Sequence, residues 1–233
     1  MGSIVSPNIV NDGLVFYMDA ANKRSYPGSG TDSFDLIHSN DGVLTNGVSF
    51  DSGNGGSFGF DGVDDYIEMD EFSFNSTQIT VSVWNFGETV SKNQCVFESG
   101  WAASGTKRCV ALLIPWSDSV VYFDAGNGLG SNDYDRISKS ATAAECNGWH
   151  QWVFTKNSTT GNQRIYHDGV LWHSDSGNTK ALVSGDRASI GKFSGGGVGY
   201  YQQGKVSQLI IYNRELSASE ILQNYNALKD RFI

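Results

Sequence analysis

The fold class is decided by residues 149–156, WHQWVFTK, and residues 164–173, RIYHDGVLWH. Aromatic and β-branched side chains occupy both alternating faces of the first segment, which indicates a strand that is covered on both sides. In the second segment Asp168 and Gly169 both tolerate a positive φ, as a type I′ hairpin turn requires. The residues on either side of this turn are therefore predicted to pair as a hairpin within an antiparallel sheet.

Short strands separated by polar turns are predicted along most of the chain. The 233 residues include 28 glycines, 3 prolines and 12% aromatic residues, which is typical of many short strands joined by Gly, Asn and Asp turns. Strands are predicted at residues 14–19, 43–50, 57–60, 66–69, 79–86, 94–98, 108–115, 119–124, 188–192 and 205–212. Residues 125–146 are predicted to form a long loop.

A helical pattern is recognised at the end of the chain. Ser217 and Glu220 have the spacing of a capping box, in which each side chain satisfies a free backbone N–H of the other. One apolar stripe at helical spacing follows, formed by Ile221, Leu222, Tyr225 and Leu228. A helix this short needs a partner, so we expect it to dock on the sheets. The predicted fold is all-β: a two-sheet antiparallel jelly-roll sandwich with one short C-terminal helix.

Composition and charge restrict the classes of function. We expect one domain over residues 10–233 after a flexible N-terminal arm over residues 1–9, because no linker-like stretch divides the chain. A net charge of −9 argues against a nucleic-acid partner, which requires a basic surface. No apolar run is long enough to span a membrane. The start of the chain, MGSIVSPN, lacks the basic and apolar regions of a secretion signal.

The three cysteines are Cys95, Cys109 and Cys146, and their spacing is not that of a metal site. Cys95 and Cys109 are expected on neighbouring strands, where they could form a disulfide. The favoured interpretation is that all three are small buried hydrophobic side chains in a protein that folds in a reducing cytosol.

Four stretches resemble the concanavalin A-like lectin/glucanase jelly roll, in its laminin-G-like, pentraxin-like branch. They are GLVFYMDAAN at 13–22, SFGFDGVDDYI at 57–67, the pair WH at 149–150 with RIYHDGVL at 164–171, and GKVSQLIIYNRELS at 204–217. They occur in the expected order over nearly the whole chain. The resemblance therefore implies a concanavalin A-like sandwich.

Shorter phrases are similar to modules in virion proteins of tailed phages. They are SYPGSG at 25–30, LTNG at 44–47 and FDGVDDY at 60–66. This similarity implies a virion protein of the capsid decoration or tail, folded in the host cytoplasm. It also implies a homo-oligomer or a particle-bound protein.

The family resemblance also implies a calcium ion, since many members hold one Ca²⁺ near the rim of the sandwich. Calcium takes six to eight oxygen ligands from carboxylates, carbonyls and water. The candidate ligands are Asp19, Asn40, Asp41, Asp61, Asp64 and Asp65. The alternative is that these side chains form Asx-turns by bonding to their own backbone at tight corners.

Carbohydrate binding requires aromatic rings beside polar groups. The C–H faces of a sugar pack on the rings, while its hydroxyls form hydrogen bonds. The candidates are aromatic residues expected on loops: Trp101, Trp116, Tyr134, Tyr200 and Tyr201. The alternative is that these rings anchor contacts between protein subunits. In contrast, Trp84, Trp149 and Trp152 are expected in the core.

Catalysis and zinc binding are disfavoured by the sequence. Relatives of the laminarinase type carry three alternating acids on one strand, but here Glu68 and Asp70 share a face while Glu71 points to the other. A solvated strand end is the favoured interpretation. The histidines, which are expected to be structural and hydrogen-bonded, lack a spacing typical of zinc sites; they are His38, His150, His167 and His173.

Together these observations predict a non-enzymatic virion protein with a lectin-like jelly roll. Its role is predicted as an adhesin or decoration that binds surface glycans of the host, or as a structural protein that cements the capsid or tail through contacts with neighbouring virion proteins. The alternatives are a laminarinase-type glycoside hydrolase and a carbohydrate-binding lectin that is not viral.

Overall fold

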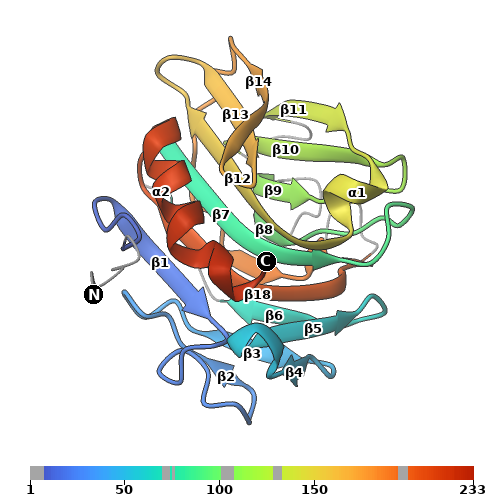
Figure 1. Ribbon diagram of the computed structural model, residues 1–233. Coiled ribbons are helices and arrows are strands. Elements are labelled where there is room, and N and C mark those ends of the chain that lie inside the picture. The colour runs from blue at the N-terminus through green and yellow to red at the C-terminus, as the bar shows by residue number, and fades with distance from the viewer. Residues whose placement is uncertain (1–7, 70–73, 75–76, 101–107, 128–132, 194–198) are drawn as a thin grey trace, which may run out of the picture.

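The computed structural model describes residues 8–69, 74, 77–100, 108–127, 133–193 and 199–233. Two large antiparallel sheets face each other and enclose the core (Figure 1). The first, sheet A, has the order β14-β13-β12-β7-β18-β5-β4, and β1 also pairs with β18. Its strands are β1 (Leu14–Asp19), β4 (Ser49–Asp51), β5 (Ser57–Asp61), β7 (Gln78–Gly87), β12 (Gly148–Asn157), β13 (Asn162–His167), β14 (Val170–Asp175) and β18 (Gln203–Tyr212).

The second sheet, sheet B, has the order β11-β10-β9-β8-β15-β6-β3-β2. Its strands are β2 (Asp32–Ser33), β3 (Gly42–Thr45), β6 (Tyr66–Met69), β8 (Phe97–Gly100), β9 (Arg108–Leu113), β10 (Val120–Gly126), β11 (Tyr134–Ser140) and β15 (Arg187–Ile190). A small hairpin, sheet C, joins β16 (Lys192–Phe193) to β17 (Tyr200–Tyr201). The helices are α1 (Ala143–Cys146), α2 (Ala218–Leu228) and the short 3-10 turns Gly53–Gly55 and Lys229–Arg231. This is the predicted jelly-roll sandwich.

The hairpin between β13 and β14 has the predicted turn. Asp168 and Gly169 have φ values of 49° and 78°, as a type I′ turn requires. Asp168 also fixes the turn to β12, because its N–H donates to the carbonyl of Gln151 and its Oδ1 accepts the N–H of Gln151 at 2.9 Å. The turn that decides the fold class is thus held by backbone and side chain together.

The C-terminal helix α2 covers the outer face of sheet A (Figure 1). Its capping box is formed as predicted, with reciprocal bonds between Ser217 and Glu220. The ring of Trp84 on β7 stacks on Tyr225 of α2 and on Phe232 beyond it, with centroid distances of 5.9 and 4.1 Å. Trp84 and Trp152 are buried as predicted. Trp149 is half-buried instead, because it packs at the rim against Phe86 and Phe232.

Residues 125–146 are not the long loop that the sequence predicted. Within them lie β11 at the edge of sheet B and the one-turn helix α1, which begins with a capping box between Thr142 and Glu145. Only Ile137 of β11 is buried, so the strand lacks the apolar alternation by which strands are recognised.

Lys156 of β12 is buried inside the sandwich, with its side chain 0% exposed. Its Nζ donates to Oδ2 of Asp135 on β11 and to the carbonyl of Ala125 on β10, both at 2.7 Å. Burial lowers the pKa of Lys156, although Asp135 partly opposes this shift. The ion pair therefore ties sheet A to one edge of sheet B.

Both ends of the described chain lie against α2. Residues 1–7 of the expected N-terminal arm lie outside the described residues, and Ile9 packs with the cluster under α2. The carbonyl of Asn8 accepts a hydrogen bond from Gln223. Among the described residues, no helix is long and apolar enough to cross a membrane.

The three cysteines are buried and none forms a disulfide, as the favoured interpretation predicted. Cys109 lies in the core between the sheets, whereas Cys95 belongs to a small cluster on the other face of sheet B. Burial raises the pKa of Cys109 and of Cys146 to about 12.

Removal of Asp135 tests the buried ion pair. We expect Asp135→Ala to lower the free energy of unfolding by about 3 kcal/mol, because it leaves the charge of Lys156 buried without its partner. Urea denaturation measures this loss. The control is Asp133→Ala, which removes a partly exposed acid 3.3 Å from Lys180 and should cost less than about 1 kcal/mol. Equal effects of the two substitutions would contradict the role of the buried pair.

The cap of α2 should make stability depend on pH. Hydrogen bonds from Arg214 and Ser217 lower the pKa of Glu220 to about 2. The native carboxyl therefore stabilises the fold fully above its usual pKa, and this contribution is lost as pH falls through about 2. We expect Glu220→Gln to cost about 1 kcal/mol at pH 7 and progressively less at lower pH, as measured by urea denaturation.

The matched control for this prediction is Asp12→Asn. Asp12 also pairs with Arg214, at 3.0 Å, but its side chain is largely exposed. We expect this control to change the free energy of unfolding by less than about 0.5 kcal/mol, both at pH 7 and at lower pH. A Glu220→Gln effect that does not change with pH would show that the charge of the cap is unimportant.

Candidate functional site

The face of sheet B that points away from sheet A carries a group of polar and aromatic side chains. Strand alternation explains its origin, since Val121 and Phe123 of β10 enter the core while Tyr122 and Asp124 point to the opposite face. We call this the outer face of sheet B.

An arginine is fixed on this outer face by a buried carboxylate. Arg136 of β11 lies directly opposite Asp124, and its Nε and Nη2 donate to the two carboxylate oxygens at 2.6 and 2.7 Å. Asp124 is 0% exposed, whereas the Arg136 side chain is 39% exposed. The bidentate hydrogen bonds raise the pKa of Arg136, so the guanidinium stays charged.

Aromatic rings surround this guanidinium. Its central carbon lies 4.7 Å from the ring centroid of Tyr122 and 5.3 Å from that of Tyr134. Trp116 packs edge-on against Tyr200 and Phe193, with centroid distances of 4.8 and 5.9 Å. Phe193 lies on β16 and Tyr200 lies on β17, so sheet C completes the aromatic group.

A pocket of about 210 Å³ opens between these side chains. We call it the aromatic pocket; it is lined by Leu113, Trp116, Asp118, Tyr122, Arg136 and Phe193. Asp118 is oriented by the hydroxyl of Tyr122, which donates to it at 2.6 Å. The pocket thus offers apolar ring faces, one cation and one carboxylate, which suits a polar ligand with C–H faces.

A row of residues, one from each neighbouring strand, continues across the outer face from Asp124. Asp124 lies opposite Ala111, and the strands beyond add Glu98, Ser189 and Glu68 in that order. Glu98 is buried, and its Oε1 lies 3.6 Å from Nη2 of Arg187. The two buried carboxylates of the row are therefore each neutralised by an arginine.

The structure brings together part of the predicted carbohydrate site. Trp116 and Tyr200 are in contact, and Tyr134 lies near them through Arg136. Tyr201 contacts Tyr66 instead, because consecutive residues of a strand point to opposite faces. Trp101 lies outside the described residues.

Of the residues that line the pocket, the sequence predicted Trp116 and missed five: Leu113, Asp118, Tyr122, Arg136 and Phe193. Tyr122 and Asp124 could have been found from the alternation within the predicted strand, since both face away from the apolar residues. Arg136 could not, because its strand was predicted as a loop.

Three of the predicted calcium ligands lie together. The carboxylate oxygens of Asp61, Asp64 and Asp65 lie within 4.8 Å of one another at the corner between β5 and β6. Two of them also make the alternative backbone bonds, since Asp61 accepts the N–H of Val63 and Asp65 accepts the N–H of Asp61. Burial, followed by the neighbouring acids, raises the pKa of Asp65. This donor set fits part of a calcium shell.

The other predicted calcium ligands lie elsewhere. The carboxylate of Asp19 accepts hydrogen bonds from Arg231 and Gln208, so a cation already occupies its surroundings. Asn40 and Asp41 form hydrogen bonds with Asp35 just before β3 begins, at the end of that strand away from the acidic corner.

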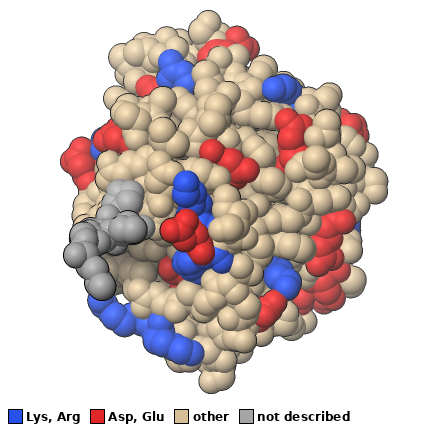
Figure 2. Space-filling view, viewed as in Figure 1, with Lys and Arg blue, Asp and Glu red and all other residues tan. Residues whose placement is uncertain are grey.

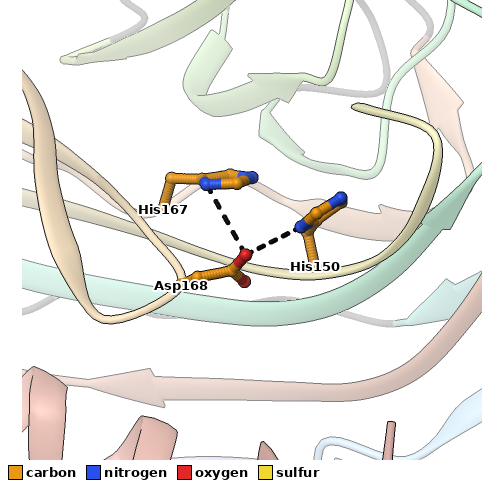
Figure 3. A group of neighbouring side chains, drawn as sticks. All are labelled: His150, His167 and Asp168. Carbon is orange, nitrogen blue, oxygen red and sulfur yellow. Dashed lines mark hydrogen bonds and ion pairs between the residues drawn. The ribbon is translucent and has the colours of Figure 1, made fainter. Parts of the chain in front are cut away.

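Two histidines and an aspartate form a second group that could bind a metal. They are His150, His167 and Asp168, which lie beside the β13–β14 turn (Figure 3). Both histidines are hydrogen-bonded, as predicted, because Nδ1 of His150 contacts Asp168 at 2.8 Å and Nε2 of His167 contacts the carbonyl of Glu145 at 3.0 Å. The bond to Asp168 raises the pKa of His150, whereas burial lowers that of His167.

The acids considered for catalysis are described only in part. Glu68 is exposed on β6, whereas Asp70 and Glu71 lie outside the described residues.

On the face drawn in Figure 2, lysines and arginines lie in separate small groups among acidic side chains.

Comparisons with known proteins place the chain in a family. A family model described as "Concanavalin A-like lectin/glucanases superfamily" matches residues 60–222. No curated protein sequence matches the chain significantly. Solved structures with a similar fold include the binding domain of botulinum neurotoxin DC in complex with rat synaptotagmin II, at a TM-score of 0.69 and 13% identity. The alignment covers 93% of this chain and 52% of that chain.

Two further neurotoxin structures are similar. One is the binding domain of botulinum neurotoxin DC in complex with SialylT, at a TM-score of 0.65 and 14% identity over 93% of this chain and 52% of that chain. The other concerns botulinum neurotoxin type C, whose cell entry depends on two ganglioside molecules, at a TM-score of 0.67 and 12% identity over 93% and 51%. This chain spans about half the length of those chains, and at such identities the likeness shows the fold alone. Because the family model matches most of the chain, the protein belongs to the concanavalin A-like lectin/glucanase superfamily.

Proposed function

We propose that the protein is a non-catalytic module that binds glycans in the aromatic pocket of sheet B. The observation that carries this proposal is the position of Arg136, which is held by a buried carboxylate and surrounded by tyrosine rings. Its bonds to Asp124 use Nε and Nη2, so Nη1 carries two further N–H donors for ligand oxygens. A sugar ring could pack on Trp116 or Tyr122 at the same time.

Family membership supports this proposal. Similar folds occur in neurotoxin binding domains, one solved with SialylT and one described as dependent on gangliosides. Gangliosides carry saccharide head groups, which fits an adhesin that recognises a host glycan. A pocket that offers ring faces, one guanidinium and one carboxylate favours a hydroxyl-rich saccharide.

We further propose that the protein is a component of a phage particle. The phrases SYPGSG and FDGVDDY resemble virion proteins of tailed phages, so the module would serve as an adhesin or decoration of a phage particle. The competing role is a cement protein, in which the same exposed rings contact neighbouring virion proteins. A lectin that is not viral would use the pocket in the same way as the adhesin.

The pairing of the buried acids supports binding rather than catalysis. Glycoside hydrolysis needs one carboxyl group that stays protonated and another that is free to act as nucleophile or base. Each carboxylate oxygen of Asp124 accepts a hydrogen bond from Arg136, and Glu98 lies beside Arg187. A carboxylate neutralised by an arginine serves to orient that arginine.

A glycan array with wild-type protein, followed by calorimetry on the strongest hit, tests the proposal. We expect Trp116→Ala and Arg136→Gln each to weaken binding at least about tenfold, since each removes a ring face or a charged donor. The matched control is Phe34→Ala, which removes an exposed ring away from the aromatic pocket and should leave the affinity unchanged.

The other outcomes separate the competing roles. Binding to phage particles without any glycan hit would support the cement role. Hydrolysis of β-glucans that is lost on Glu68→Gln would establish the glycoside hydrolase instead. Unchanged glycan affinity in both pocket variants would place the site elsewhere.

Calcium at the corner of Asp61, Asp64 and Asp65 stays a prediction, tested by thermal melts with added Ca²⁺ and with a chelator. An ion that binds only the folded chain raises the melting temperature. We expect this rise to disappear in Asp64→Asn, whose side chain lies in the group but is exposed. Identical melts in calcium and chelator would contradict the prediction.

A further inference from the structure

The group of His150, His167 and Asp168 has the arrangement of a metal site. Figure 3 shows a ring nitrogen of each histidine directed at the aspartate between them. Nδ1 of His150 lies 2.8 Å and Nδ1 of His167 lies 3.6 Å from the same carboxylate oxygen, Oδ2 of Asp168. Ligands of a tetrahedral zinc ion are about 3.3 Å apart, which follows from zinc–ligand distances of about 2.0 to 2.1 Å. The two printed separations lie on either side of this value, and the ligand atoms of all three residues lie within 4.8 Å of one another.

Other contacts hold these donors in place. The second carboxylate oxygen of Asp168 accepts the N–H of Gln151, which leaves Oδ2 directed at the histidines. The Nε2 of His167 bonds to the carbonyl of Glu145 at 3.0 Å, and its ring packs against Trp152. A metal-binding histidine typically donates its other N–H to such a carbonyl, which fixes the nitrogen that remains for the metal.

The group is also accessible to solvent. Its side chains are between 15% and 28% exposed, so an ion and a water molecule can reach it. The charged side chains that act on His167 are Asp168, Glu145 and His150. The nearby carboxylates therefore favour a bound cation.

The geometry points to a site for a divalent transition-metal ion of the zinc type, bound by His150, His167 and Asp168 with water completing its coordination. Two imidazoles and one carboxylate suit such ions, whereas calcium and magnesium prefer oxygen ligands. His150 lies on β12, His167 ends β13 and Asp168 begins the β13–β14 turn, while the carbonyl that orients His167 comes from α1. A bound ion would thus join three elements at one edge of sheet A.

Titration of the chelator-treated full chain with zinc sulfate tests this inference by calorimetry. We expect one zinc ion per chain, and a rise in melting temperature on the order of 5 °C at a hundredfold excess over the dissociation constant. Calcium and magnesium should not compete. His150→Gln and Asp168→Asn should each weaken zinc binding at least about tenfold.

Two controls keep the test decisive. Asn tolerates a positive φ and keeps an oxygen for the N–H of Gln151, so Asp168→Asn should preserve the turn, as circular dichroism can verify. The exposed His38 lies outside the group, and His38→Gln should bind zinc like the wild type. An absence of saturable zinc binding would overturn the inference. Equal affinity in the wild type, His150→Gln and Asp168→Asn would also overturn it.

Discussion

The central strands of sheet A are buried on both faces, and the rest of the structure depends on this constraint. Val81 and Val83 of β7 point into the sandwich, while Trp84 points outward. β12 and β18 repeat the pattern, with Phe154 and Leu209 inside and Val153 and Ile210 outside. Such strands must be covered twice to remove their side chains from water. Sheet B covers one face, and α2 with the chain ends covers the other.

The outer face of sheet B holds polar side chains beside a small buried apolar cluster formed by Cys95, Ala111, Leu113 and Phe193. Strand alternation sends only every second residue into the core, and the others remain for function. The buried Asp124 is tolerated there because Arg136 donates a hydrogen bond to each of its two carboxylate oxygens. This pairing also fixes the guanidinium against the tyrosine rings. The Asp124–Arg136 pair thus compensates for the burial of the carboxylate and also shapes the aromatic pocket.

The elements that the sequence predicted correctly are those formed by interactions between residues close in the chain. The Asp168-Gly169 turn and the Ser217 cap depend on residues close in the chain, and both are formed as predicted. The polar edge strand β11 was missed because its pairing with β10, rather than its own pattern, makes it a strand. The group around Asp168 was also missed. Its histidines meet through strand pairing across 17 residues, which no spacing rule recognises.

The buried thiols give the chain internal reporters of its own motions. Only a thiolate reacts quickly with alkylating reagents, and burial keeps Cys109 and Cys146 protonated at neutral pH. Modification must therefore wait until the surrounding structure opens. Both thiols belong to the main core cluster, which Cys146 enters from α1 and Cys109 from β9. Their labelling rates would separate fraying of one short helix from opening of the whole sandwich, without any engineered probe.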